Sequence, residues 1–237
     1  MPDAGQRSRR PAPRPGARYV GFVGLAFLVL IGLATYNTIR TASGGLLGVS
    51  AAVRGRPLPE FAVPNIHGGP NADANIFQDD CASSANPCPA GERRPSACRI
   101  PRGIGAIRVC DLFDRPLVIS FWFLKGASCL PTQDDVNAVA RRFRGRVNFL
   151  SIDVRDDIGE VRRTVAEHHW EIPVGWDRDG AVSDLYRVGG CPTVAFAYPG
   201  GIFAGAKASV DSLTKAKLTA DVRNLLAASR RRAEASR

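Results

Sequence analysis

Residues 116–129 read PLVISFWFLKGASC, and this stretch decides the fold. Its first nine residues form a near-continuous apolar run of β-branched and aromatic side chains, which is typical of a strand buried on both faces of a sheet. From Cys129 onward, apolar residues return at helical spacing as far as Phe143. A buried strand followed within a few residues by a helix predicts a domain of the α/β class.

The same patterns extend outward on both sides of this stretch. Strands are expected over residues 107–112, 116–124, 147–154, 192–198 and 202–206, with the last two joined by a hairpin turn. Helices are expected over residues 129–143, 156–170, 179–188 and 211–228, the last capped by Asp211. Residues 57–66 are expected to be extended, and residues 71–101 to form a loop. This order predicts a mixed central sheet with helices on both faces.

A separate apolar segment lies near the N-terminus. Residues 20–39 carry no charge, and their number is about the 20 residues that a helix needs to cross a bilayer. We expect a transmembrane anchor over residues 19–40, behind a basic tail over residues 1–18 that the positive-inside rule places in the cytoplasm. A cleaved signal peptide is the alternative, but its apolar region is normally shorter. Either interpretation places the rest of the chain outside the cytoplasm. With the anchor retained, the protein is a single-pass protein of the cell membrane whose C-terminal domain is extracytoplasmic.

The expected domain organisation follows from these segments. A flexible linker over residues 41–56 leads to one domain over residues 57–228, which carries a cysteine-bearing loop at 71–110. Residues 229–237 form a second basic tail.

Composition narrows the range of functions. The chain has 237 residues, of which 45% are hydrophobic and 23% charged, as expected for a folded domain. Its net charge of +10 is concentrated at the two ends, so we interpret it as a topology signal and solvated tails, not as a nucleic-acid arm. Three histidines argue against a multi-His metal centre, and the absence of a glycine-rich phosphate motif argues against nucleotide cofactors. No cofactor is therefore expected.

Two stretches of the sequence resemble the signatures of thioredoxin-like proteins, FWFLKGASC at 121–129 and YRVGGCPTVAFAYPGG at 186–201. They are similar to the membrane-anchored TlpA/ResA type of thiol-disulfide oxidoreductase and its peroxiredoxin-like relatives. GRPLPEFAVP at 55–64 resembles the opening strand of the same group. The resemblance implies a thioredoxin fold, an extracytoplasmic location and dithiol chemistry. It also implies that Pro192 is cis and faces the active site.

The chain departs from that resemblance at the motif itself. The family has a C-x-x-C pair at the helix start, whereas this sequence has Gly126 at the first position and Cys129 at the second. If Pro192 is the family's cis-proline, Cys191 lies beside the helix start, so we expect Cys129 and Cys191 to form a redox-active pair. Bridging requires Cα atoms within about 7 Å. Cys129 is the expected nucleophile, because a helix N-terminus stabilises a thiolate.

Two registers of that helix remain open at this point. With Ser128 as the N-cap, Cys129 lies in an exposed first turn, whereas the family register places it one turn deeper. Three other functions also remain open: inert buried thiols or a static disulfide, a peroxiredoxin-like thiol peroxidase using Cys129, and a non-catalytic thioredoxin-fold binding module. As an oxidoreductase, the chain would act on a protein thiol or disulfide, or exchange electrons with a membrane donor.

The remaining four cysteines are expected to form structural disulfides. They are Cys81, Cys88, Cys98 and Cys110, all in or beside the loop before the first core strand. Pairing of nearest neighbours, Cys81–Cys88 and Cys98–Cys110, is the simplest of three possible arrangements. A Cys₄ zinc site is the alternative, but its cysteines normally occur in pairs two to four residues apart.

Three other side chains carry weaker signals. Asp153 ends a predicted strand, and we interpret it as a solvated strand end and not as a proton-transfer group. His168 lies at the end of the helix predicted over residues 156–170 and is expected to face water. Trp122 is expected to pack in the core.

Overall fold

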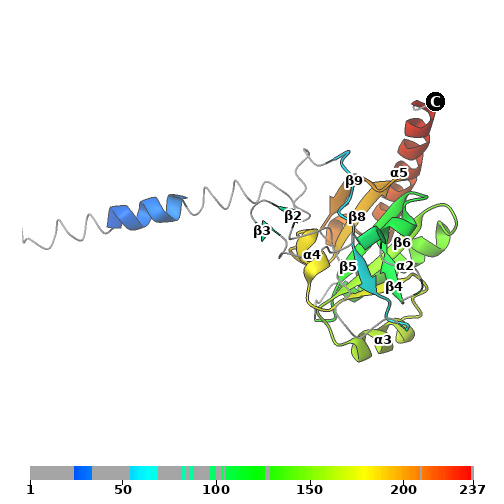
Figure 1. Ribbon diagram of the computed structural model, residues 1–237, viewed down its shortest axis with the longest axis horizontal. Helices are drawn as coiled ribbons and strands as arrows, with labels where there is room; N and C mark the ends of the chain where they lie inside the picture. Colours follow the sequence, from blue (N-terminus) through cyan, green and yellow to red (C-terminus); the bar gives the residue numbers. More distant parts are fainter. Residues whose placement is uncertain are drawn as a thin grey trace, which may run out of the picture. The chain divides into compact units, whose positions relative to one another are not determined.

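The computed structural model describes residues 24–33, 54–68, 82–83, 86–87, 97–99, 103, 105–125, 129–208 and 210–235. The chain divides into two units, residues 1–44 and residues 45–237. In the first unit, residues 24–33 form a helix (Figure 1). Its large apolar side chains, such as Leu25 and Phe27, are exposed. Across the described ranges, no helix combines the length and the apolarity that a bilayer crossing requires. The anchor over residues 19–40 stays a prediction.

The second unit is built on a five-stranded mixed sheet in the order β7-β6-β5-β8-β9 (Figure 1). Its strands are β5 (Leu117–Trp122), β6 (Asn148–Val154), β7 (Val174–Asp177), β8 (Thr193–Tyr198) and β9 (Ile202–Lys207). β5, β6 and β7 are parallel, whereas β8 runs antiparallel to β5 and to β9. Every residue of β5 is buried, as its continuous apolar run predicts for the central strand.

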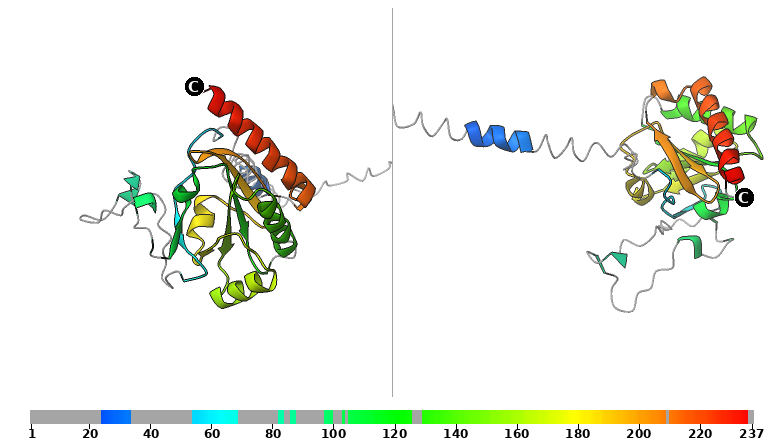
Figure 2. Two further views of the ribbon diagram at one scale, coloured as in Figure 1. Left: turned by 90° about the vertical axis from the view of Figure 1, so that its right-hand side faces the viewer. Right: turned by 90° about the horizontal axis from the view of Figure 1, so that it is seen from above.

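Helices cover both faces of the sheet (Figure 2). They are α2 (Cys129–Arg142), α3 (Ile158–Glu167), α4 (Ala181–Leu185) and α5 (Lys215–Ala235). Because alternate residues of a strand face opposite sides, Val118 packs with α2 and α5, while Ile119 and Phe121 pack with α4 and the segment before β1. α3 packs its valines beside Trp122 and Cys129.

A smaller layer precedes the central sheet. Its strands are β1 (Ala62–Pro64), β2 (Ala82–Ser83), β3 (Asn86–Pro87) and β4 (Ala106–Arg108), and its short 3-10 helices are η2 (Ala97–Arg99) and η3 (Val109–Leu112). β1 pairs antiparallel with β4. A backbone bridge from Asn65 to Gly175 joins the residue after β1 to β7, so the β1–β4 pair is attached to the edge of the main sheet.

Some elements differ from the sequence prediction. β7 was not expected, because its four residues are too few to display a period. The edge strand expected over 107–112 ends at Arg108, where the chain turns into η3. Asp211 lies in the separate 3-10 helix η4 (Val210–Ser212) and does not cap α5. Instead, the backbone N–H of Lys215 donates to Asp135 Oδ2 of α2 at 2.9 Å. α5 continues to Ala235, into the segment assigned to the basic tail.

Candidate active site

A disulfide joins Cys129 to Cys191 across 62 residues of sequence, with Cα atoms 5.5 Å apart. Cys129 is the first residue of α2, and Cys191 precedes β8 through a cis peptide bond to Pro192. β5 and β8 are neighbouring antiparallel strands, so the end of β5, which leads to α2, lies beside the beginning of β8. The fold thereby brings together the two cysteines that the sequence proposed as a pair.

The two cysteines differ in exposure. Cys129 is 1% exposed, whereas Cys191 is half-buried. Among the described residues, α2 begins at Cys129. This residue is buried, not exposed as the register with Ser128 as N-cap predicted. Ser128 and Gly126 themselves lie outside the described residues. An incoming thiol therefore has better access to the Cys191 side of the disulfide.

Aromatic side chains surround this disulfide. Cys129 packs in an apolar cluster with Trp122, Trp170 and Trp176, and Cys191 packs against the same cluster. Trp122 and Trp170 meet edge to face with ring centroids 4.9 Å apart, a favoured aromatic geometry. The chain approaching the disulfide is also fixed, because the backbone N–H of Leu124 donates to Asp156 Oδ2 at 2.5 Å. The described surroundings of Cys129 are therefore apolar and largely aromatic.

Asp153 is completely buried, so its interpretation as a solvated strand end is wrong. Its strand register places it between Trp122 of β5 and Trp176 of β7. Neither carboxylate oxygen of Asp153 has a hydrogen-bond partner among the described residues, and the indole Nε1 of Trp122 likewise has none. Burial, assisted by the nearby carboxylate of Asp156, raises the pKa of Asp153 to about 9. The group is therefore neutral at pH 7.

A second disulfide joins Cys98 of η2 to Cys110 of η3, with Cα atoms 5.8 Å apart. This is the nearest-neighbour pairing that the sequence suggested. Cys81 and Cys88 lie outside the described residues. A disulfide at the Cys98–Cys110 position leaves these two sulfurs unavailable to a resident Cys₄ zinc site in this state of the protein.

The sequence of the chain was compared with known proteins. No family model matches it. Over 118 residues it is 25% identical to the thiol-disulfide oxidoreductase ResA of Oceanobacillus iheyensis, a match that covers 48% of this chain and 57% of that relative. The chain thus spans little more than half the length of the curated relative that it matches.

Solved structures establish the fold. A candidate thiol:disulfide interchange protein DsbE from Chlorobium tepidum superposes with a TM-score of 0.52 at 16% identity, covering 73% of this chain and 97% of that one. The thioredoxin domain of a thiol-disulfide oxidoreductase from Bacteroides vulgatus superposes with a TM-score of 0.51 at 11% identity. The match again covers 73% of this chain and 97% of that one. The predicted thioredoxin-like α/β fold is confirmed.

Proposed function

We propose that this chain of thioredoxin-like fold is a thiol-disulfide oxidoreductase of the TlpA/ResA type, whose redox couple is Cys129 and Cys191. The observation that carries the proposal is the disulfide itself, which joins the first residue of an α-helix to the residue before the cis-proline. A purely structural crosslink would not need one buried and one accessible partner at a helix start.

The accessible side of the disulfide is the entry point for electrons. A substrate thiolate attacks the sulfur of Cys191, forms a mixed disulfide with it, and releases Cys129 as a thiolate. Burial opposes this charge, whereas the partial positive charge at the N-terminus of α2 stabilises it. A second substrate thiol then attacks the mixed disulfide. Two substrate thiols are thereby oxidised to a disulfide, and the enzyme's disulfide is reduced to two thiols.

This assignment reverses the roles expected from the sequence, in which Cys129 was the nucleophile. When the reduced enzyme acts on a partner's disulfide, Cys191 attacks that disulfide and Cys129 resolves the mixed disulfide. The reason is that thiol-disulfide exchange is reversible and passes through the same mixed disulfide in both directions. Cys191 thus occupies the functional place of the cysteine that Gly126 replaces. The peroxidase alternative requires a free and accessible thiol at Cys129, which is buried and bonded here.

The test is trapping of the mixed disulfide in the full chain. A Cys129→Ser variant keeps the accessible cysteine but lacks the resolving one. An added peptide with an internal disulfide should therefore accumulate on Cys191 as a mixed disulfide, as read by intact-mass spectrometry. The reciprocal Cys191→Ser variant keeps only the buried cysteine and should react at least about tenfold more slowly, since access limits thiol exchange.

A Cys98→Ser/Cys110→Ser double variant is the matched control, because it also lacks one disulfide but keeps Cys129 and Cys191. Through its Cys129–Cys191 disulfide, it should oxidise the dithiol form of the same peptide at the wild-type rate. Equal trapping in both single variants would contradict the assignment of roles. No trapping in either variant would favour the non-catalytic binding module.

We also propose that the chain is anchored in the cell membrane through residues 19–40, with its thioredoxin-like domain outside the cytoplasm. The uncharged apolar run and the arginines on either side of it support this proposal, as do the exposed apolar side chains of helix 24–33. Carbonate extraction of membranes and protease accessibility in intact cells are the test. Recovery of the full-length chain in the carbonate-soluble fraction would contradict it.

A further inference from the structure

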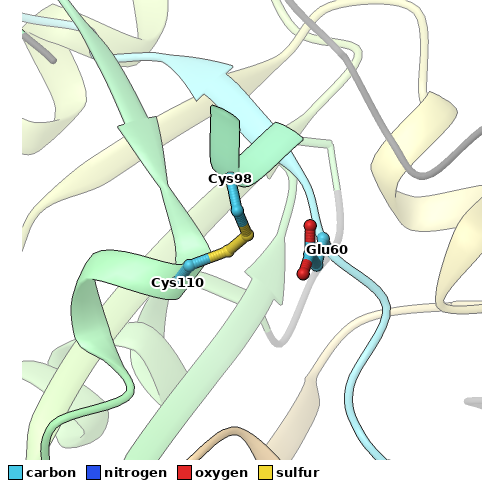
Figure 3. Close-up of side chains that lie close together, drawn as sticks. All are labelled: Glu60, Cys98 and Cys110. Atoms are coloured by element: carbon cyan, nitrogen blue, oxygen red, sulfur yellow. A yellow bond between two sulfur atoms is a disulfide. The ribbon is translucent and has the colours of Figure 1, made fainter. Parts of the chain in front are cut away.

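A carboxylate lies against the second disulfide. One carboxylate oxygen of Glu60 and the sulfurs of Cys98 and Cys110 fall within 4.8 Å of one another, although the three residues come from separate segments (Figure 3). Glu60 Oε2 is buried and has no hydrogen-bond partner among the described residues. A buried carboxylate oxygen without a donor is costly, so its position calls for a partner that this oxidised state does not supply.

The strand register explains why Glu60 lies there. β1 and β4 pair antiparallel with Ala62 opposite Arg108. The backbone N–H of Val109 continues the ladder by donating to the carbonyl of Phe61 at 3.0 Å. This bond places the first turn of η3, which carries Cys110, beside the segment that leads into β1, in which Glu60 precedes Phe61. The approach of Glu60 to Cys110 therefore follows from backbone contacts at the end of β4 and does not depend on a flexible side chain alone.

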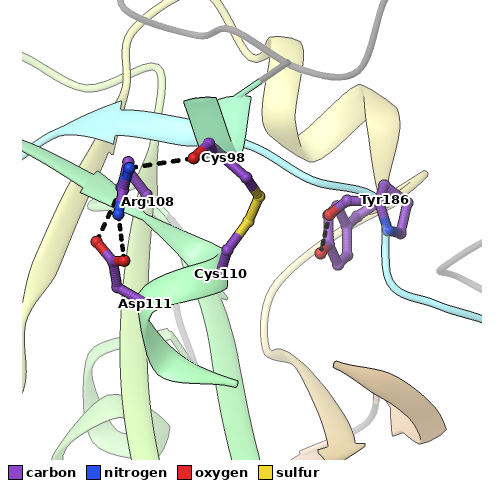
Figure 4. Close-up of a disulfide and its surroundings, with 6 residues drawn as sticks. Cys98, Arg108, Cys110, Asp111 and Tyr186 are labelled. Atoms are coloured by element: carbon purple, nitrogen blue, oxygen red, sulfur yellow. Dashed lines mark hydrogen bonds and ion pairs between the residues drawn. A yellow bond between two sulfur atoms is a disulfide. The ribbon is translucent and has the colours of Figure 1, made fainter. Parts of the chain in front are cut away.

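The backbone around the disulfide is held by contacts other than the disulfide (Figure 4). Arg108 Nη1 donates to the carbonyl of Cys98 at 3.1 Å, and the same guanidinium pairs with Asp111 of η3. On the other side, the buried hydroxyl of Tyr186 donates to the carbonyl of Pro59, next to Glu60, at 2.8 Å. Reduction of the S–S bond therefore leaves the three side chains tethered close to one another.

We propose that Glu60, Cys98 and Cys110 form a redox-gated Zn²⁺ site. A dithiol reductant converts the Cys98–Cys110 disulfide to two thiols and is itself oxidised to a disulfide. Zn²⁺ then binds the two thiolates and the Glu60 carboxylate, with release of the two thiol protons to solvent. A fourth ligand position stays open to water. In the oxidised state, neither sulfur is a thiolate and the site is closed to the metal.

Geometry and charge both suit this ion. Two Zn–S bonds of about 2.3 Å at the tetrahedral angle place the sulfurs about 3.8 Å apart. The present Cα separation of 5.8 Å allows this by rotation of the two side chains. Thiolates select soft or borderline ions over Mg²⁺ and Ca²⁺, which prefer oxygen ligands. The metal would also provide Glu60 Oε2 with the partner that it lacks.

The experiment uses the full chain with Cys81, Cys88, Cys129 and Cys191 changed to serine, so that Cys98 and Cys110 are its only cysteines. Co²⁺ is the probe, because thiolate coordination gives it a charge-transfer band. The reduced protein should bind one Co²⁺ per chain with this band, Zn²⁺ should displace the Co²⁺, and the disulfide form should bind neither. Far-UV circular dichroism checks that the reduced chain stays folded.

A Glu60→Gln change in the same background tests the third ligand. It should weaken Zn²⁺ binding by at least the ~10–100-fold that loss of even an outer-shell partner costs. Glu167→Gln, which removes an exposed carboxylate on α3, is the matched control and should leave the affinity unchanged. The proposal is overturned if the reduced protein gives no thiolate–Co²⁺ band, if Glu60→Gln binds as tightly as its parent, or if the reduced chain unfolds even with Zn²⁺ present.

Discussion

Asp134 of α2 accepts a hydrogen bond from the indole Nε1 of Trp170 at 2.7 Å, and the same carboxylate oxygen lies 2.8 Å from His168 Nδ1. Trp170 in turn packs edge to face on Trp122, in the cluster that holds Cys129. One exposed carboxylate thus ties α2, the helix that carries Cys129, to the end of α3. His168, which was expected only to face water, is part of this connection.

Removing this carboxylate should destabilise the domain. In Asp134→Ala, the indole N–H of the buried Trp170 loses its acceptor, and an unsatisfied buried donor costs about 1–3 kcal/mol. Urea unfolding should therefore show a lower midpoint than for the wild type. Glu167→Ala, which removes an exposed carboxylate next to His168, should stay within about 0.5 kcal/mol of the wild type. An unchanged midpoint for Asp134→Ala would show that the Asp134–Trp170 bond contributes nothing to stability.

Asp153 should make stability fall as the pH rises. Burial raises its pKa from the ordinary 3.8 to about 9 in the folded chain, so between these values the folded state binds up to one more proton than the unfolded state. Each unit of rising pH in this window then lowers the free energy of unfolding by up to about 1.4 kcal/mol, which amounts to about 4 kcal/mol between pH 5 and pH 8. Asp153→Asn, which cannot ionise, should remove this slope.

The measurement for Asp153 is urea unfolding at pH 5 and pH 8 for the wild type and the variant. Glu167→Gln serves as the control, because it removes an exposed carboxylate and should keep the wild-type slope. A variant with the same loss of stability between pH 5 and pH 8 as the wild type would show that Asp153 does not titrate in this window.

Gly175 lies where the segment containing β1 crosses β7, and it should not tolerate a side chain. An added Cβ would come too close to Val63 Cγ2, and would lie 3.0 Å from Ile152 Cδ1. Overpacking of this kind typically costs about 1–3 kcal/mol. Thermal unfolding should therefore show a lower Tm for Gly175→Ala. Gly190→Ala, whose methyl group meets no atom within 4 Å, should not lower it comparably.

Loss of the second disulfide should cost stability without affecting the proposed redox couple. The Cys98–Cys110 bond closes a loop with a sequence separation of 12 residues, for which chain entropy predicts about 3 kcal/mol. Cys98→Ala/Cys110→Ala should lower the free energy of unfolding by about this amount in the absence of metal. A stability equal to that of the wild type would mean that the contacts of Arg108 hold this layer without the bond.

Much of the fold could be predicted because its elements carry local patterns. The apolar run of β5 and the helical spacing after Cys129 are visible in short windows, and both elements appear within two residues of their expected bounds. Pro192 and the cysteine before it also stand out in the sequence. The four residues of β7 left no period to detect, and the start of α5 depends on Asp135 of another helix.

The sequence by itself determined the strand–helix order, the cysteine at the start of α2 and the cysteine before Pro192, because each is set by neighbours within a few residues. Only the tertiary structure decided that Cys129 is buried while Cys191 is half-exposed, that Asp153 lies between two tryptophans, and that Glu60 meets Cys98 and Cys110. Exposure and contact of this kind arise where segments far apart in the chain pack together. Hydrophobic periodicity describes one segment at a time and carries no information about which partner covers it.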